Sequence, residues 1–212
     1  MSSAEYVVDR AVALAAKGER VLLGIAGAPG AGKTTLAVWL VDRLSARGVV
    51  AAHVPMDGFH LGDAVLDRLG LSERKGAIDT FDPSGYLALL RRLRAETGGT
   101  VFAPAFEREI EQPIAASIPV DPSVRIVVSE GNYLLSPLDP WPSVRREFDE
   151  VWFADVDHEQ RRQRLRARHE RYGKTAEQAA EFVLRVDEAN ARVILGTREH
   201  ADLFVDVDAV VG

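Results

Sequence analysis

The sequence predicts an α/β fold: a central, mostly parallel five-stranded sheet flanked by helices, as in a three-layer sandwich. Two observations lead to this prediction. Short apolar runs of strand length alternate along the chain with longer segments of helical periodicity, which is the pattern of a parallel sheet covered on both faces. A glycine-rich turn separates the first of these runs from the first long helix, at a position where such sheets bind ligands.

The expected strands are the apolar runs, which share the length and continuity of buried strands. In chain order they are 21–26, 49–54, 100–106, 124–129, 151–156 and 203–207. The segment 107–122 carries three prolines and several charges. We expect it to be a loop, of the kind that can carry function.

The expected helices are the segments with apolar residues three or four positions apart. They are 4–16, 34–44, 63–69, 84–94, 158–169 and 175–195. Ser84 is expected to cap the fourth of these helices. Thr175 and Gln178 have the spacing of a capping box at the start of the last.

The turn between strand 21–26 and helix 34–44 matches the phosphate-binding pattern G-x-x-x-x-G-K-[ST]. Its residues are Gly27, Ala28, Pro29, Gly30, Ala31, Gly32, Lys33 and Thr34. Glycines let successive backbone N–H groups point at phosphate oxygens, and the helix start adds partial positive charge. Lys33 is expected to reach the β- and γ-phosphates of a nucleotide and Thr34 to bind Mg²⁺. The fold is therefore expected to be that of the P-loop NTPases.

Two acidic residues restrict the reactions that a phosphate-loop protein with this sequence could catalyse. Asp57 follows the second expected strand, where its carboxylate could face the γ-phosphate and accept a hydroxyl proton. Gly58 is expected to let the chain turn sharply there, although a plain turn aspartate is the alternative. Glu130 follows strand 124–129, and phosphate-loop proteins often hold Mg²⁺ with an acid at such a position. A solvated residue at a strand end is the alternative for Glu130.

Residues 158–174 hold seven basic residues against two acidic ones. Arg161, Arg164, Arg168 and Arg171 share one helical face. Such a face could close over phosphates as a lid, at about 158–176, with Gly173 as a hinge. The alternative is a solvated cationic face with one or two functional arginines. Because Leu165 is nearly its only apolar anchor, we expect this helix to dock weakly.

Composition indicates one domain, 1–212, in a protein of 212 residues with a net charge of −6. This charge argues against general nucleic-acid binding. The chain has no cysteine, no metal-binding pattern among its five histidines, and no run of membrane-spanning length. No signal peptide is read. A cytoplasmic protein that binds neither nucleic acid nor membrane is expected.

Several motifs together resemble one family of small-molecule kinases, which includes phosphoribulokinase, uridine kinase and bacterial pantothenate kinase. The resemblance is strongest to its fructokinase-like branch. The motifs that carry it are Gly27 to Thr35, Met56 to His60, Arg74 to Gly76, Thr80 to Asp82, Pro104 to Arg108, Glu130 to Tyr133, Arg164 to His169 and Asp187 to Asn190.

The resemblance implies a role for each matching position. Asp57 would activate the acceptor hydroxyl, Glu130 would support the metal, and Arg164 and Arg168 would lie in a lid over ATP. Thr35 and Asn190 would lie at the nucleotide. The acceptor pocket, at about 57–119, would involve His60, Lys75, Asp82, Arg108 and, beyond that range, Tyr133. Family members are usually dimeric, so a homodimer is expected.

These observations predict an ATP-dependent, Mg²⁺-dependent kinase that phosphorylates a hydroxyl of a small metabolite, with a sugar preferred. Catalysis is expected to rest on Asp57, Lys33 and Arg168. A nucleoside such as uridine, or a pantothenate-like acceptor, is the alternative substrate. A nucleotide-dependent regulatory ATPase or switch is the alternative of another class, although neither the guanine-reading Asn-Lys-x-Asp element nor an ABC signature occurs. A kinase fold that only binds its ligand is disfavoured by the intact Lys33, Asp57 and Glu130.

Overall fold

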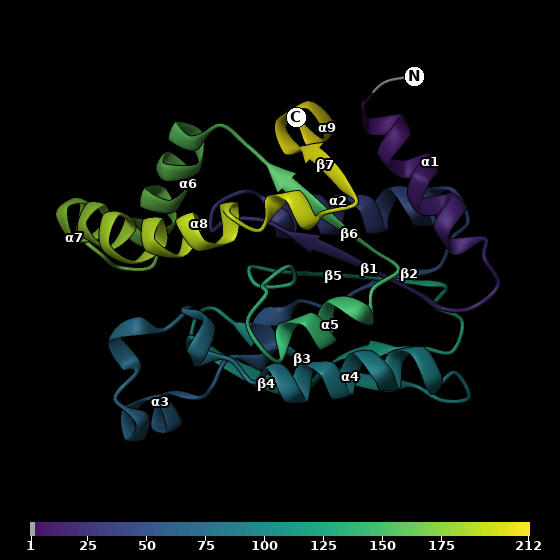
Figure 1. Ribbon diagram of the computed structural model, residues 1–212, viewed down its shortest axis with the longest axis horizontal. Helices are drawn as coiled ribbons and strands as arrows, with labels where there is room; N and C mark the ends of the chain where they lie inside the picture. The colour runs from purple at the N-terminus through teal and green to yellow at the C-terminus, as the bar shows by residue number, and fades with distance from the viewer. Residues whose placement is uncertain (1–2) are drawn as a thin grey trace.

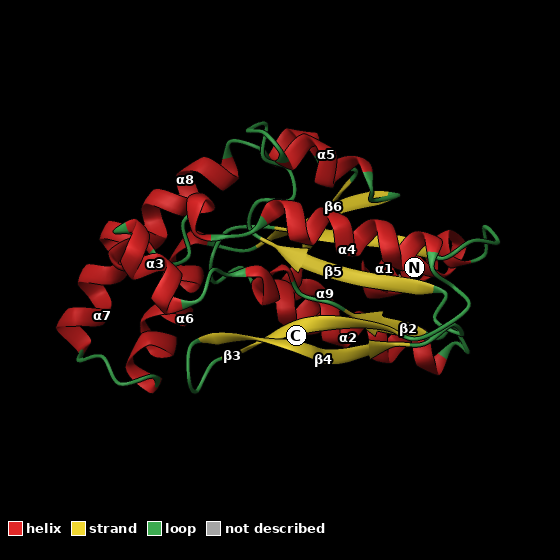
Figure 2. Ribbon diagram, turned by 90° about the horizontal axis from the view of Figure 1, so that it is seen from below, coloured by secondary structure: helices red, strands yellow, loops and turns green. Residues whose placement is uncertain are grey.

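The structure, a computed structural model, describes residues 3–212. Its main sheet has five strands in the order β2-β5-β1-β6-β7, and every neighbouring pair is parallel. The strands are β1 (Val21–Ala26), β2 (Ala51–His53), β5 (Ile126–Gly131), β6 (Glu150–Asp155) and β7 (Leu203–Asp206). The expected central sheet is confirmed. Because all five strands run the same way, their carboxyl ends meet at one edge, where α3, α6 and α7 also lie (Figure 2).

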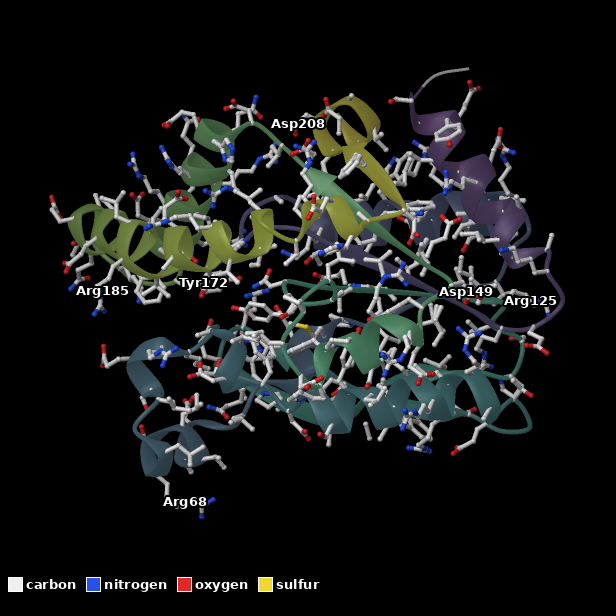
Figure 3. The ribbon with its side chains drawn as sticks, viewed as in Figure 1. Arg68, Arg125, Asp149, Tyr172, Arg185 and Asp208 are labelled. Carbon is white, nitrogen blue, oxygen red and sulfur yellow. The ribbon has the colours of Figure 1, made fainter. Side chains whose placement is uncertain are left out.

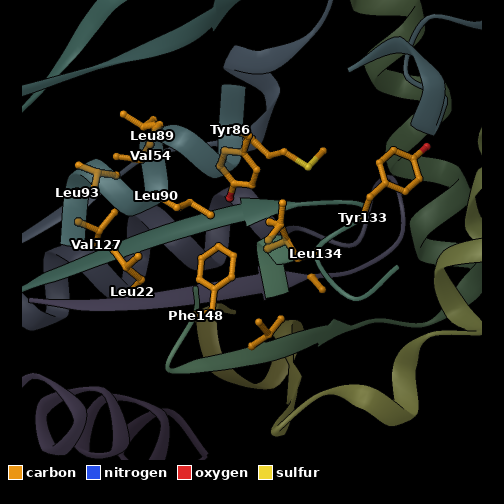
Figure 4. Packing of buried hydrophobic residues seen from close by; sticks show 14 of the residues in the cluster. Leu22, Val54, Tyr86, Leu89, Leu90, Leu93, Val127, Tyr133, Leu134 and Phe148 are labelled. Atoms are coloured by element: carbon orange, nitrogen blue, oxygen red, sulfur yellow. The ribbon is translucent and has the colours of Figure 1, made fainter. Parts of the chain in front are cut away.

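Helices cover both faces of this sheet, so the three-layer sandwich is confirmed. Alternate residues of one strand enter opposite cores: Leu22 packs into one and Leu23 into the other. The helices α1 (Ser3–Ala15), α2 (Lys33–Ala46) and α9 (Val207–Val211) cover one face. The helices α4 (Pro83–Ala95) and α5 (Trp141–Arg146) cover the other face (Figure 1). Figure 4 shows Tyr86 and Leu90 of α4 packed beside Val127 and Phe148.

The segment expected as a loop at 107–122 is mostly a strand, and that prediction is wrong. Strand β3 (Val101–Glu107) pairs antiparallel with β4 (Gln112–Val120) to form a separate hairpin. Proline is compatible with β4 because a two-stranded sheet leaves one edge of each strand unpaired. Pro113 and Pro119 stand opposite Phe106 and Phe102. The hairpin packs on the short 3₁₀ helix η1 (Met56–Phe59), so it borders the carboxyl edge of the sheet.

A helical arm lies at the same edge (Figure 1). It consists of α6 (His158–Arg171), α7 (Ala176–Phe182), the π-helix η4 (Val183–Asp187) and α8 (Glu188–Leu195). The expected helix 175–195 therefore has the predicted extent, but a π-turn interrupts it. The capping box of Thr175 and Gln178 is confirmed.

The remaining elements are short. They are α3 (Asp63–Leu69) and the 3₁₀ helices η2 (Ser72–Arg74), η3 (Ile78–Thr80) and η5 (Arg198–His200). Within residues 3–212, no helix combines the length and apolar character that crossing a membrane requires. The cap expected at Ser84 is instead provided by Asp82, whose carboxylate accepts the backbone N–H of Gly85 at 2.8 Å.

Candidate active site

A cavity of about 780 Å³ opens at the carboxyl edge of the main sheet. Residues from several elements at that edge line it, among them Gly30 and Lys33 of the phosphate loop, Asp57 of η1, Arg108 after β3, Glu130 of β5, Arg168 of α6 and Asn190 of α8. The topology thus brings together residues that are more than 150 positions apart in the chain. Strand ends and helix starts build the site, as expected for a parallel sheet.

The phosphate loop has the backbone that its glycines predict. Gly30 and Gly32 have φ angles of 79° and 81°, in the left-handed region that favours glycine. Lys33 begins α2, and its buried Nζ donates to the carbonyl of Ala28 at 3.2 Å and to Oδ1 of Asn132 at 2.7 Å. Burial lowers the pKa of Lys33, against the opposing influence of Glu130 and then Asp57. The ammonium group is therefore held at the loop by Ala28 and Asn132, within the influence of both negative charges.

Thr34 and Glu130 form a pair of oxygen donors beside Lys33. The hydroxyl of Thr34 donates to Oε1 of Glu130 at 3.0 Å, and Glu130 is only 4% exposed. Burial by itself raises the pKa of Glu130, but His53 and the charge of Lys33 outweigh it and hold that pKa below its usual value. Nε2 of His53 is 3.7 Å from the carboxylate and has no hydrogen-bond partner within residues 3–212.

This donor set fits Mg²⁺. Mg²⁺ is usually held by one or two protein oxygens, and phosphate oxygens and waters complete its octahedron. No group of three or more His, Asp or Glu side chains in the described part of the chain could enclose a metal by itself. A hydroxyl and a buried carboxylate next to the phosphate loop are therefore suited to a metal that arrives with a nucleotide.

Asp57 faces the same cavity as Lys33. Its Oδ2 accepts from the guanidinium of Arg108 at 3.1 Å, and its side chain is 23% exposed. Gly58 lies within the 3₁₀ turn of η1, where a sharp turn was expected, but its φ is not positive. A Cβ on Gly58 would lie 2.5 Å from the carbonyl oxygen of Pro104. Gly58 is therefore required for the hairpin to approach η1, and this approach brings Arg108 to Asp57.

His60 and Lys75 also line the cavity, as expected for an acceptor pocket. The ring of His60 lies between those of Phe81 and Phe106, at centroid distances of 4.0 and 4.7 Å. Burial lowers the pKa of His60 more than the adjacent Asp57 raises it. Nζ of Lys75 donates to Asp63 at 2.5 Å and also contacts a backbone carbonyl.

Two residues expected in the acceptor pocket are placed elsewhere, which corrects both expectations. Neither Asp82 nor Tyr133 lines the cavity. Asp82 is the cap of α4 described above. Tyr133 is 2% exposed and donates to the carbonyl of Gly76 at 2.8 Å, and burial raises the pKa of its phenol. Nδ2 of Asn190 lies 3.5 Å from the same carbonyl, so Asn190 borders both the cavity and the loop that carries Lys75.

The arginines of α6 differ in what they contact, and the prediction that this helix docks weakly is wrong. Leu165 is fully buried, and Arg161 is 2% exposed. Arg161 donates to the carbonyl of Pro29 at 3.2 Å and pairs with Glu188. A Cβ on Gly30 would lie 2.7 Å from Cγ of Leu165. The first half of α6 is therefore packed directly on the phosphate loop.

The other arginines of this face are less buried than Arg161. Arg164 pairs with Asp208 of α9, which is labelled in Figure 3, and it borders the cavity. Arg168 lines the cavity and has no ion pair among residues 3–212. Burial and then the charge of Arg108 lower the pKa of Arg168. Arg171 is exposed, as the solvated alternative predicts.

Asn132, His169 and Asp187 are among the cavity residues that were not predicted as site residues. Asn132 could have been found from its position just past β5, two residues after Glu130. His169 ends the motif Arg164 to His169 that carries the family resemblance, but it belongs to no metal-binding pattern among the five histidines. Asp187 faces the cavity only because η4 is a π-turn, and the sequence carries no local signal for that turn.

The chain was compared with known proteins. The model of the phosphoribulokinase/uridine kinase family matches residues 22–211. A Schizosaccharomyces pombe protein named as a candidate uridine kinase is 36% identical over 175 residues, which are 80% of this chain and 74% of the relative. The ATP-dependent kinase-like protein notR' of Aspergillus versicolor is 38% identical over 152 residues, which are 68% of this chain and 88% of the relative.

A solved structure has the same fold over nearly its whole length. The crystal structure of a candidate fructose transport system kinase from Silicibacter sp. TM1040 has a TM-score of 0.88 and 35% identity, and the match covers 96% of this chain and 98% of that one. The match of the family model alone spans most of the chain. The chain therefore belongs to the phosphoribulokinase/uridine kinase family, and it is an ATP-dependent P-loop kinase.

Proposed function

We propose that the protein transfers the γ-phosphoryl group of ATP to a hydroxyl of a neutral sugar or sugar-like polyol. The observation that carries this proposal is the placement of Asp57 and Lys33 on one cavity, which is large enough for a nucleotide phosphate chain and a small acceptor. A carboxylate that faces a phosphate cradle across such a space can serve as the base for phosphoryl transfer.

In this proposal the acceptor oxygen attacks the γ-phosphorus while the bond from that phosphorus to the β,γ-bridging oxygen breaks. Asp57 takes the hydroxyl proton, and ADP leaves. Arg108, paired with Asp57, holds the carboxylate toward the cavity. Lys33 and the loop amides bind the phosphates, and Arg168 faces the group in transfer. Thr34 and Glu130 would hold Mg²⁺, which neutralises charge on the phosphate oxygens.

The charges around the acceptor side favour a neutral molecule. Arg108 is paired with Asp57, and Lys75 is paired with Asp63. Of the other cations that line the cavity, Lys33 and Arg168 are needed by the phosphates and Arg164 is paired with Asp208. Lys174 places its ammonium 4.8 Å from the ring of Phe182. A second phosphate or a carboxylate on the acceptor would therefore find few available cations.

The nature of the lining supports a polyol over a nucleoside. The acceptor side carries Ser72, Glu73, Glu109 and Glu111, whose oxygens can accept hydrogen bonds from hydroxyl groups. The His60 ring is covered by Phe81 and Phe106, so it does not offer an open face on which a base could stack. The fructose transport system name of the Silicibacter structure supports the same choice, whereas the name of the S. pombe relative supports uridine.

A panel assay tests the acceptor. ADP release from Mg·ATP is measured with D-fructose, D-ribose, uridine and pantothenate, each against a reaction without acceptor. We expect a sugar to give the largest increase in kcat/KM. A larger increase with uridine or pantothenate would overturn the acceptor class. ADP release that no acceptor changes would instead indicate a regulatory ATPase.

A substitution tests the base. Asp57→Asn is expected to lower turnover by roughly 10²- to 10⁴-fold, the usual contribution of a general base, while AMP-PNP binds as before. Asp79→Asn is a matched control, because Asp79 also lies in a 3₁₀ helix and pairs with an arginine, at 3.0 Å, but does not line the cavity. Full turnover by Asp57→Asn would refute the assigned base.

A further inference from the structure

His169 and Asp187 form a hydrogen-bonded pair on the cavity wall that the proposed reaction does not yet use. Nε2 of His169 lies 2.8 Å from Oδ2 of Asp187. The two side chains are 14% and 8% exposed, and both residues line the cavity. The ring of Phe182 packs edge-on against the imidazole at a centroid distance of 4.8 Å. The imidazole of His169 is therefore held by Asp187 and by Phe182, and it is accessible from the cavity.

The two partners come from different elements. His169 is in the last turn of α6, and Asp187 is the last residue of the π-helix η4. A π-turn is a costly departure from a regular helix, and such turns often occur at functional sites. Here the turn sets Asp187 on the same cavity wall as Asn190. The pair thus joins the end of α6 to η4, which comes later in the chain, after α7.

Arg168, the neighbour of His169, needs such a support. It has no ion pair within residues 3–212, and the like charge of Arg108 acts on it, whereas the charge of Asp187 attracts it. The position of its guanidinium therefore depends on where the backbone of α6 is held. Arg161 and Leu165 fix the first half of the helix to the phosphate loop. The hydrogen bond between His169 and Asp187 holds the end of α6 in the same way.

We propose that the His169–Asp187 pair is a positioning device: it holds the end of α6 so that the guanidinium of Arg168 lies on the γ-phosphate of bound ATP. Both members act through Arg168 and not on the reacting atoms. This inference rests on the proposed function, since it presupposes that Arg168 binds the γ-phosphate. Loss of the hydrogen bond leaves the charge in place and lets the second half of α6 move away.

A double-mutant cycle on nucleotide binding tests the inference without requiring an acceptor. Dissociation constants for Mg·AMP-PNP and Mg·ADP are measured by calorimetry for the wild type, Arg168→Ala, His169→Ala and the double variant. AMP-PNP contains the γ-phosphate and ADP does not, so their ratio reports the contact of Arg168. We expect each single variant to weaken AMP-PNP about tenfold, the value of one charge-assisted contact, and to leave ADP unchanged. The double variant should lose no more AMP-PNP affinity than either single variant does.

Two further variants separate positioning from folding. His169→Gln places an amide nitrogen near the position of Nε2, so it should recover most of the AMP-PNP affinity. His158→Ala removes an exposed histidine from the start of the same helix and should change neither constant. Thermal unfolding of each variant is recorded, and an equal loss of ADP and AMP-PNP binding marks a general defect that would overturn the proposal.

The outcomes distinguish this inference from the proposed function. If Arg168→Ala leaves AMP-PNP binding unchanged, Arg168 does not bind the γ-phosphate, and the positioning role is refuted together with the part assigned to Arg168 in the transfer. Transfer to a sugar is then still decided by the acceptor panel and by Asp57→Asn. If Arg168→Ala weakens AMP-PNP but His169→Ala does not, or if the two losses multiply in the double variant, only the positioning role is refuted.

Discussion

Gly30→Ala should separate the phosphate loop from α6, and Gly48→Ala provides the matched control. The two glycines have nearly the same backbone, with φ angles of 79° and 76°. An alanine in the left-handed region costs about 1–2 kcal/mol in either place. They differ in their surroundings: nothing lies within 4 Å of a Cβ on Gly48, whereas a Cβ on Gly30 would lie 2.7 Å from Leu165 Cγ and 2.9 Å from the carbonyl oxygen of Arg161.

The difference between the two variants therefore measures the packing of α6 on the loop. Forcing a methyl group into a filled contact costs about 1–3 kcal/mol. For a chain of this length each kcal/mol lowers Tm by about 2–4 °C, so Gly30→Ala should melt roughly 2–12 °C below Gly48→Ala. Scanning calorimetry gives this difference, and titration with Mg·AMP-PNP should show weakened binding only for Gly30→Ala. Equal melting temperatures and equal affinities would refute the tight docking of α6.

The other predictions concern the metal, pH and the hairpin. Thr34→Ala should raise the Mg²⁺ concentration that half-saturates ATP binding by roughly tenfold, and Thr34→Ser should restore it; an unchanged Mg²⁺ requirement excludes this ligand. Burial lowers the folded-state pKa of His60, so the unfolded state binds more protons below about pH 6.5 and stability falls as pH decreases. His60→Asn should lose less stability than the wild type in urea titrations between pH 7.5 and 5.5, whereas the exposed His158→Asn should behave as the wild type does. Gly58→Ala, whose Cβ would press on a carbonyl of β3, should cost about 1–3 kcal/mol, and Gly99→Ala, with open space around it, should not; equal melting temperatures would argue against the close approach of the hairpin.

The fold could be predicted wherever local patterns and tertiary packing agree. Continuous apolar runs such as Val21–Ala26 belong to strands that are buried on both faces, so the run itself reveals the strand. Strand β4 could not be found in this way. Its middle is exposed and it contains two prolines, and it is a strand only because β3 pairs with it.

The site was predictable where its residues lie at the ends of strands. Lys33 and Asp57 follow β1 and β2, and Glu130 is the last residue but one of β5, so the parallel topology gathers them without further information. Asp82 and Tyr133 lie close in the chain to cavity residues, yet one caps a helix and the other holds a buried carbonyl. Chain proximity does not determine the direction of a side chain. Arg161 was grouped with a cationic surface because no local pattern shows that it reaches the carbonyl of Pro29.

The π-turn at Val183–Asp187 affects how the chain can change its length. It holds about one residue more than an α-helical turn, yet it returns the chain to nearly the same angle around the helix axis. Removing one residue there would restore a regular α-helix and leave α7 and α8 facing nearly as they do now. The same removal inside α8 would rotate every later residue of that helix by about 100°. A single deletion is therefore expected to be tolerated better within Val183–Asp187 than within the regular helix that follows.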